Sequence, residues 1–377
     1  MSCGINILMQ NSNSIHNSRC AVGIGNTRDI SGADFAGGGG AHSCDFYDVI
    51  SIKNLLIAWK EFRKGKRSNA NVASFELCLE ENIFNMHRIL STGTWKPDPY
   101  RVSVIQDPKR RTIHAASIRD RVLYQALYRK LYPVFDQHFI YDVYSSRNFK
   151  GTHAGVGRFA VFTRKVSQNY TRAGYVLKCD IRKFFDSVDH RILFQLISKR
   201  ISDKRLLRLI YDIIDSFHHA SNKGLPLGNV TSQLFANIYM NEFDQFVKHR
   251  LKAKYYIRYC DDFIIAEVSL EILLKYIETI RAVLHEELLL DLHPKKVEIR
   301  KIHSGIDFLG YVSLPHYAVI RTSTKNRMLR KLHEAKKQRD SGVISKAKFD
   351  SIVASYSGML KHCKGKKILD QIKDIIK

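Results

Sequence analysis

Cysteine is scarce in this chain of 377 residues, and long apolar runs are missing. The seven cysteines include no CxxC spacing, which argues against a disulfide scaffold and against a zinc ribbon. No window approaches the roughly 20 consecutive apolar residues of a membrane-spanning helix, and the first residues lack the basic and apolar regions of a signal peptide. We therefore expect a cytoplasmic protein with reduced thiols and no membrane partner.

Acidic residues are also in short supply relative to basic ones. The chain has 61 Lys and Arg against 36 Asp and Glu, a formal net charge of +25. Residues 321–377 hold 16 of the basic residues and only 5 of the acidic ones. A polyanion such as nucleic acid is the expected partner of such a charge, and the basic C-terminal segment is the expected place of contact.

Residues 1–45 differ in composition from the rest of the chain. They contain eight of the 21 glycines, four of them consecutive, together with repeated Asn and Ser. No apolar periodicity is sustained there, so we predict a flexible extension.

Globular patterning begins at residue 46. Helical periodicity covers residues 50–62, 74–90, 118–134, 231–252 and 270–289, and β-rich runs cover 100–106, 174–180 and 254–266. Ser117 is the expected N-cap of the helix that begins at residue 118. Because strands and helices alternate irregularly, the pattern favours an α+β fold over a doubly wound parallel sheet.

Three aspartates carry the chemistry that the residues themselves suggest. Asp261 and Asp262 lie between two β-rich runs, as expected of a tight turn, and Asp180 ends another predicted strand. Adjacent carboxylates repel each other, so a cation is expected beside them. If the strand ends are neighbours, the three carboxylates form an oxygen cluster suited to Mg²⁺. Two such ions would support the in-line phosphoryl transfer of a polymerase.

The order of several segments resembles that of a reverse transcriptase of the group II intron-like class. The similar segments are PKRRTI, IRDRVLYQALYRKLYPVFDQHF, YSSRNFKGTHAG, YVLKCDIRKFFDSVDH, KGLPLGNVTSQLFANIYMNEFDQF, YIRYCDDFII, LHPKKVEI and FLGY. The resemblance implies a right-hand polymerase, with fingers and palm over residues 46–312 and a short basic helical thumb over 313–377. In the palm, an antiparallel sheet with helices is expected.

A finer resemblance is to the reverse transcriptases of diversity-generating retroelements. Most reverse transcriptases have Gln-Gly where this chain has Leu227-Gly228, and Ser-Pro where it has Ser232-Gln233. The retroelement group copies RNA with errors opposite adenine. A leucine offers the incoming base no directed hydrogen bond, so Leu227 predicts the same reduced selectivity here.

The resemblance also implies roles for individual residues. Asp180 and Asp261 would bind both metal ions, with Asp262 beside them and the backbone carbonyl of Ile181 as a further ligand. Phe185 matches the aromatic residue that excludes a 2′-hydroxyl. The remaining residues would contact the nucleotide or its pyrophosphate: Lys109 and Arg111 at the triphosphate, Leu227, Gly228 and Gln233 at the base and sugar, and Lys296 or its neighbour Lys295 as proton donor.

The expected ligands and partners follow from the same resemblance. They are two Mg²⁺ ions, for which Mn²⁺ would substitute, deoxynucleoside triphosphates, a template RNA with its cDNA or primer, and a small basic oligomeric accessory protein. Two alternatives remain open at this point. One is a defence-associated or group II maturase-like reverse transcriptase, and the other is a catalytically silent RNA-binding protein that keeps the palm fold.

Overall fold

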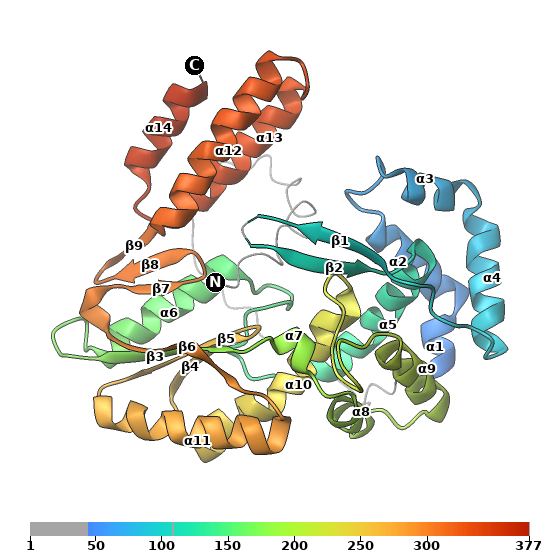
Figure 1. The fold of residues 1–377 in the computed structure, drawn as a ribbon, viewed down its shortest axis with the longest axis horizontal. Coiled ribbons are helices and arrows are strands. Elements are labelled where there is room, and N and C mark those ends of the chain that lie inside the picture. Colours follow the sequence, from blue (N-terminus) through green and yellow to red (C-terminus); the bar gives the residue numbers. More distant parts are fainter. Residues whose placement is uncertain (1–43, 108, 377) are drawn as a thin grey trace, which may run out of the picture.

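The computed structural model describes residues 44–107 and 109–376. Its elements form a right hand, with the thumb above the palm and the fingers beside it (Figure 1). The fingers comprise α1 (Phe46–Ile50), α2 (Ile52–Phe62), α3 (Ala70–Leu77), α4 (Leu79–Ser91) and α5 (Ile118–Asp136), with the hairpin of β1 (Arg101–Ile105) and β2 (Arg111–Ala115). This mixture of helices and antiparallel sheets confirms the predicted α+β class.

The palm is built on a four-stranded antiparallel sheet in the order β4, β5, β3, β6. The strands are β3 (Tyr175–Ile181), β4 (Tyr255–Tyr259), β5 (Asp262–Glu267) and β6 (Leu292–Lys301). The remaining elements up to residue 304 are α6 (Thr152–Val166), α7 (Phe184–Ser187), α8 (His190–Ser198), α9 (Lys204–Asp215), α10 (Val230–Gln245), the π-helix η3 (Phe246–Arg250), α11 (Leu270–Leu288) and the 3₁₀ turn η4 (Ile302–Ser304).

Both faces of the palm sheet are buried along β3, β4 and β5, whereas the edge strand β6 is mostly exposed or half-buried. Leu177 and Phe263 lie in the larger apolar core with α10 and α11. Val176 and Ile264, one residue away on each strand, lie in a second cluster with α6. This alternation fixes which side chains of the strands face each layer.

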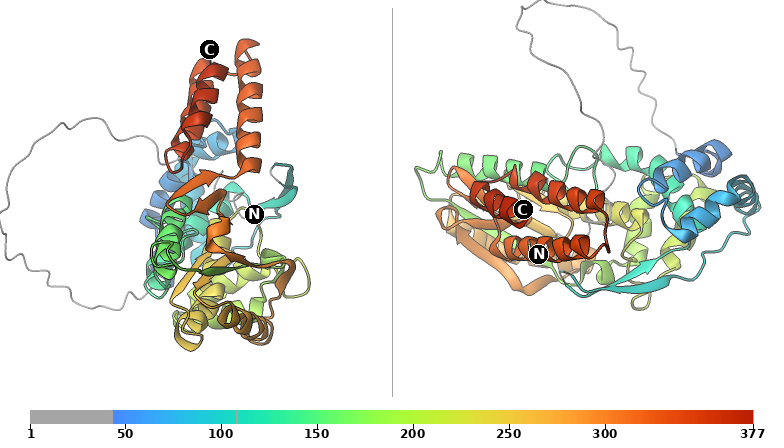
Figure 2. Two further views of the ribbon diagram at one scale, coloured as in Figure 1. Left: turned by 90° about the vertical axis from the view of Figure 1, so that its left-hand side faces the viewer. Right: turned by 90° about the horizontal axis from the view of Figure 1, so that it is seen from above.

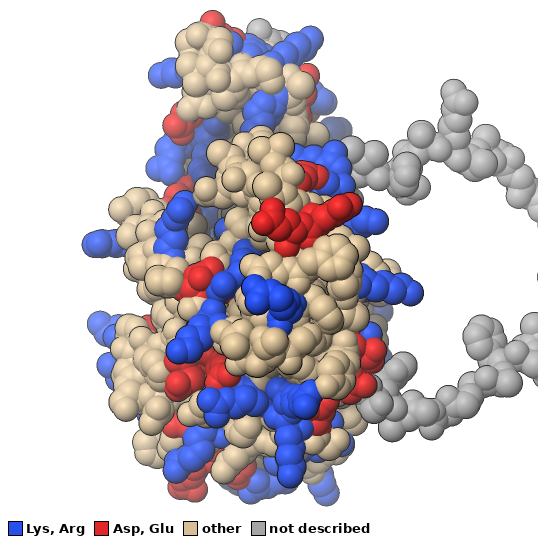
Figure 3. Space-filling model, turned by 90° about the vertical axis from the view of Figure 1, so that its right-hand side faces the viewer, with Lys and Arg blue, Asp and Glu red and all other residues tan. Residues whose placement is uncertain are grey.

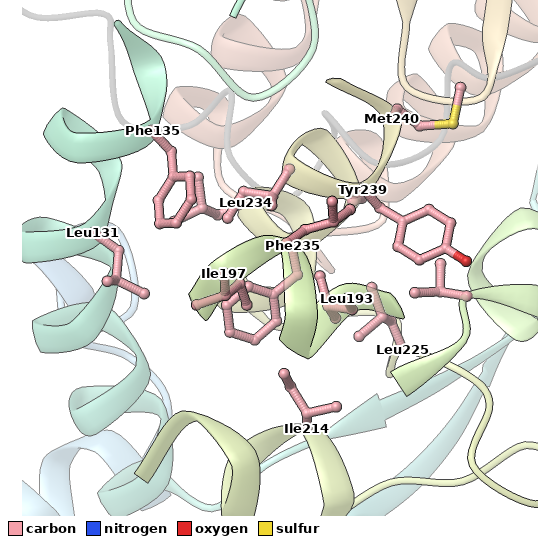
Figure 4. Packing of buried hydrophobic residues seen from close by; sticks show 14 of the residues in the cluster. Leu131, Phe135, Leu193, Ile197, Ile214, Leu225, Leu234, Phe235, Tyr239 and Met240 are labelled. Atoms are coloured by element: carbon pink, nitrogen blue, oxygen red, sulfur yellow. The ribbon is translucent and has the colours of Figure 1, made fainter. Parts of the chain in front are cut away.

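Helices α5, α8, α9 and α10 meet in the larger core. Figure 4 shows Phe235 of α10 surrounded by side chains from the other three helices. Burial of one such aromatic side chain stabilises the fold by about 1.5–3 kcal/mol. The labelled members of the cluster are Leu131, Phe135, Leu193, Ile197, Ile214, Leu225, Leu234, Phe235, Tyr239 and Met240.

The thumb follows a small three-stranded sheet that packs above the palm. This sheet consists of β7 (Ile306–Phe308), β8 (Tyr311–Leu314) and β9 (Tyr317–Ile320), and the thumb helices are α12 (Thr322–Asp340), α13 (Lys346–Leu360) and α14 (Lys366–Ile376). The three helices stand beside one another away from the palm (Figure 2). The predicted boundary at residues 312 and 313 therefore falls within β8, and the helical unit begins nine residues later.

Local signals explain where several elements begin. Ser117 caps α5, as predicted, by accepting a hydrogen bond from the Asp120 amide. Asp45 caps α1 through the Asp48 amide, so the last residue of the predicted extension belongs to the fold. Residues 1–43, the rest of that prediction, lie outside the described residues. Within the described part, none of the helices has the length and apolar run needed to cross a bilayer.

Candidate active site

The three predicted aspartates lie together at one end of the palm sheet. Asp180 on β3 is the direct cross-strand partner of Asp262 on β5. Because alternate residues of a strand share a face, these carboxylates lie on the same face as Val176 and Ile264, which is covered by α6. Asp261 lies in the two-residue turn between β4 and β5, next to Asp262. The sequence prediction that the three side chains are neighbours is met.

The turn that carries Asp261 is held by contacts from elsewhere in the chain. Cys260 has a φ of 59°, in the left-handed region, which costs a non-glycine residue about 1–2 kcal/mol. Its amide donates a hydrogen bond to Ser145 Oγ at 2.9 Å, and its carbonyl oxygen accepts one from Arg258 Nη1 at 3.0 Å. These two bonds fix the turn conformation and hence the position of Asp261.

A buried polar network lies directly behind this turn. Arg258 on β4 has a fully buried side chain and donates two hydrogen bonds to Asp244 of α10, at 2.7 and 2.6 Å. Asp244 also accepts the Tyr256 hydroxyl at 2.6 Å, and Arg258 reaches Asn237 at 3.2 Å. The sequence analysis missed this network. Its available signal was an arginine within the otherwise apolar run that precedes the aspartates.

Burial and mutual repulsion raise the pKa values of carboxyl groups in this cluster. Loss of solvation, followed by the charges of Asp262 and Asp180, raises the pKa of Asp261 to about 7. Burial likewise raises the pKa of Asp180, opposed by a hydrogen bond from Lys296 and reinforced by Asp262. A cation between such groups favours their charged forms. The all-oxygen donor set therefore fits Mg²⁺ or Mn²⁺.

Lys296 is the lysine that contacts the cluster. Its Nζ lies 2.8 Å from Asp180 Oδ2, whereas the neighbouring Lys295 is exposed. Both lysines line a cavity with Asp180 and Asp262. The cavity is also bordered by residues of β3, β6 and β7: Val176, Lys178, Glu298, Arg300, Ile306 and Asp307.

A register shift in β6 brings Lys296 to this position. Cys179 pairs with Val297, but Ile181 pairs with Leu292, so residues 293–296 form an irregular segment between the two pairs. Such a bulge redirects side chains at the edge of a sheet. Ile181, predicted to offer its carbonyl oxygen to a metal, is the buried last residue of β3.

Phe185 lies just beyond the end of β3. It is half-buried on the short helix α7, and its ring contacts Phe184 edge-on at a centroid distance of 5.3 Å. Its carbonyl oxygen accepts a hydrogen bond from the Leu225 amide at 2.7 Å. The predicted sugar-selecting residue is thus tied to the loop that leads to Leu227.

The loop with Leu227 and Gly228 packs against the fingers hairpin. The Leu227 carbonyl oxygen accepts a hydrogen bond from the His114 amide of β2 at 3.1 Å. Gly228 has a φ of 116°, and a Cβ there would lie 2.9 Å from Ile113 Cγ2, so both conformation and space require glycine. Gln233, on α10, accepts a hydrogen bond from the Ser146 hydroxyl at 3.0 Å. Its predicted nucleotide contact stays a prediction.

Lys109 and Arg111 lie on the fingers hairpin rather than on the palm. Lys109 is exposed in the turn between β1 and β2, and Arg111 is the first residue of β2. The same turn reaches the thumb, because Asp107 Oδ2 lies 2.5 Å from Lys331 Nζ of α12. The fingers and the thumb therefore touch each other through this ion pair.

Basic side chains are spread over the molecule. On the fingers side, Figure 3 shows Lys and Arg distributed from the lower part of the molecule to the thumb, interleaved with acidic residues. The charge excess is thus not confined to one patch of this face. Such a distribution suits contact with an extended polyanion.

Comparison with protein families gives one match that spans the site. Residues 98–313, which include every predicted site residue, match the family model described as reverse transcriptase (RNA-dependent DNA polymerase). This match covers more than half of the chain.

Individual proteins are similar to this chain at 12–28% identity. The chain is 28% identical over 262 residues to Protein YkfC of Escherichia coli (strain K12), covering 59% of this chain and 68% of that protein. It is 27% identical over 185 residues to the group II intron-encoded protein LtrA of Lactococcus lactis subsp. cremoris, covering 47% of this chain and 30% of LtrA. Telomerase from Candida albicans, solved with a fragment of telomeric RNA, aligns with a TM-score of 0.45 at 12% identity, covering 76% of this chain and 64% of that one.

Proposed function

Because this chain belongs to the reverse transcriptase (RNA-dependent DNA polymerase) family, we propose that it synthesises DNA on an RNA template. The observation that carries the proposal is the pairing of Asp180 with Asp262 across two strands, with Asp261 in the adjoining turn. A carboxylate cluster of this kind at one end of a sheet can hold the two metal ions of an in-line phosphoryl transfer. We place the activity in the cytoplasm.

In this proposal Asp180, Asp261 and Asp262, with the Ile181 carbonyl oxygen, hold two Mg²⁺ ions. When bound, such ions would lower the pKa of the attacking 3′-hydroxyl and offset the charge of the leaving pyrophosphate. Lys296 lies at the same cavity and donates a proton to the pyrophosphate.

The remaining predicted residues act on the incoming deoxynucleotide. Lys109 and Arg111 contact its triphosphate, and Gly228 and Gln233 border its binding place. Phe185 excludes a 2′-hydroxyl by its bulk. The hydrogen bond from the Leu225 amide to the Phe185 carbonyl oxygen places Phe185 beside the loop that leads to Leu227.

Primer extension on an RNA template tests the central claim. Asp261→Asn should abolish DNA synthesis with Mg²⁺, because it removes a charge from the cluster. Asp350→Asn, on the exposed surface of α13, is the matched control and should extend primers like wild type. Template binding with no synthesis by wild type, with accessory protein and RNA supplied, would favour the silent RNA-binding protein instead.

We include low fidelity opposite template adenine in the proposal. Leu227 stands where most reverse transcriptases have a glutamine, and its apolar side chain offers no directed hydrogen bond to the base. Its loop is anchored to β2 through backbone atoms, so a change of side chain leaves that anchor in place.

Substitutions at this residue test the claim directly. Leu227→Gln should lower misincorporation opposite adenine, whereas Leu227→Met, which stays apolar, should keep the wild-type error spectrum. Sequencing of cDNA made on a template containing all four bases gives the comparison. If wild type and Leu227→Gln make errors opposite adenine at the same frequency, Leu227 is not the cause of those errors.

We further propose that the enzyme serves a diversity-generating retroelement. The stretch from Leu225 to Gln233 supports this, and a small basic oligomeric accessory protein and a structured template RNA would then be partners. The similarity to LtrA favours a second candidate, a group II intron-encoded protein. A variable repeat beside a near-identical template repeat in the neighbouring DNA supports the first, and a flanking intron supports the second.

A further inference from the structure

Two histidines and an aspartate meet on the side of the molecule where α8 begins and α9 ends. His190 is the first residue of α8, Asp215 is the last residue of α9, and His218 follows three residues later. One ligand atom from each lies within 4.8 Å of the others. His218 Nε2 is 3.4 Å from Asp215 Oδ1, and the two imidazole rings are 5.0 Å apart at their centroids.

A contact with a backbone carbonyl oxygen fixes the tautomer of His190. Its side chain is buried, with 6% of the residue exposed, and Nε2 lies 2.7 Å from the Gly224 carbonyl oxygen. A carbonyl oxygen only accepts, so Nε2 carries the hydrogen and the lone pair is on Nδ1 of the neutral ring. Burial lowers the pKa of His190, which favours this neutral form.

His190 Nδ1 has no hydrogen-bond partner among the described residues, although it is buried. A buried polar atom without a partner costs about 1–3 kcal/mol, so it calls for an explanation. Histidines that bind metals typically donate their other ring N–H to a carbonyl oxygen or carboxylate, which is the arrangement seen with Gly224.

We propose that His190 Nδ1, Asp215 and His218 form a zinc site separate from the carboxylates of the palm, with solvent as the fourth ligand. Two imidazole nitrogens and one carboxylate oxygen suit Zn²⁺, whereas Mg²⁺ prefers oxygen ligands alone. Tetrahedral bonds of about 2.0–2.2 Å place ligand atoms roughly 3.4 Å apart. Asp215 and His218 already have this spacing, and both are partly exposed, so their side chains are free to close on His190.

The proposed ion would join α8 to the loop that follows α9. That loop is already tied to the palm by two backbone hydrogen bonds, from Gly224 to Val188 at 2.9 Å and from Leu225 to Phe185 at 2.7 Å. Since the ion would cross-link segments that are distant in sequence, its binding would stabilise this part of the fold. The proposal is independent of the polymerase function.

Zinc binding by the full-length, untagged protein tests this proposal. The protein is stripped with a chelator and titrated with Zn²⁺ in excess Mg²⁺, which keeps the carboxylate site occupied. Wild type should retain a zinc ion that resists dialysis, measured by elemental analysis, and should melt at a higher temperature with zinc. Co²⁺ in place of Zn²⁺ should give the visible absorption of a tetrahedral site.

Variants at the exposed ligands decide whether this is the site. His218→Ala and Asp215→Asn should each weaken zinc binding by at least roughly tenfold and remove the zinc-dependent rise in melting temperature. His219→Ala, at the adjacent exposed histidine, is the matched control and should bind like wild type. Circular dichroism confirms that each variant is folded, and either ligand variant alone suffices for the test.

Three results would overturn the proposal. These are no zinc retained by wild type, equal zinc affinity in wild type and a folded ligand variant, or preferential binding of Fe²⁺ over Zn²⁺. The last result matters because two histidines and a carboxylate also serve as an iron ligand set.

Discussion

At the scale of single residues, Lys296 and Lys295 differ in one respect, because only Lys296 contacts the aspartate cluster. Its ammonium group lies 2.8 Å from Asp180, while Lys295 beside it is exposed. Either lysine matched the family motif, and the choice between them depends on the irregular segment of β6. Contact with the cluster makes Lys296 the better candidate for a proton donor.

Substitution of each lysine by methionine separates the two candidates. Lys296→Met should lower the rate of nucleotide addition by at least about 100-fold, the lower range for loss of a general acid. Lys295→Met should remain near the wild-type rate. Single-turnover kinetics at saturating deoxynucleotide give both rates, and the reverse order would assign the role to Lys295.

At the scale of elements, the β4–β5 hairpin depends on a buried ion pair. Arg258 and Asp244 have no exposed side-chain surface, and they also bind Tyr256 and Asn237. Removal of one partner leaves a buried charge uncompensated, which is far more costly than loss of a surface pair. The hairpin turn should therefore lose its geometry when the pair is broken.

Arg258→Met should lower the free energy of unfolding by about 3–5 kcal/mol. The matched control is Arg250→Met, whose exposed pair with Glu287 should contribute no more than about 1 kcal/mol. Chemical denaturation followed by circular dichroism gives both values. Similar losses in the two variants would show that the buried pair does not anchor the hairpin.

Across the whole molecule, the fingers and the thumb are joined by an ion pair between Asp107 and Lys331. Lys331 lowers the pKa of Asp107, and the nearby Arg327 and Arg330 lower it further, whereas partial burial opposes this effect. Because the pKa of Asp107 is lowered, the contact is fully stabilised at pH values above the ordinary pKa of aspartate. This stabilisation is lost as the pH falls through the lowered pKa. The contact should therefore persist at neutral pH.

Fluorescent labels on the β1–β2 turn and on α12 would report this contact. Lys331→Ala and Asp107→Asn should each widen the distance between the labels at neutral pH, and high salt should do so in wild type by screening. Acidification should widen the distance between the labels in wild type to the value seen in the variants. The distance in the variants should not change with pH. Lys337→Ala, further along α12, is the control; if it opens the molecule equally, general charge rather than this pair holds the fingers and thumb together.

How much the sequence could predict differs between these scales. The cap at Ser117 and the strand–turn–strand around residue 261 were predictable, because each depends on residues close together in the chain. The meeting of Asp180 with this turn was predicted only on the condition that the two strand ends are neighbours, because it depends on the pairing of distant strands. The helix expected over residues 74–90 is two helices, α3 and α4, divided at Cys78, whose φ and ψ of −114° and 41° are not helical. No local periodicity reveals such a break.

The sequence by itself determined the α+β class, the excess of positive charge and the order of the polymerase motifs. Tertiary structure alone decided that Lys296 reaches Asp180, that Arg258 pairs with Asp244, and that His190 lies beside His218. The physical reason is separation along the chain. Periodicity and caps act over a few residues, whereas these contacts depend on strand register and helix packing that bring distant segments together.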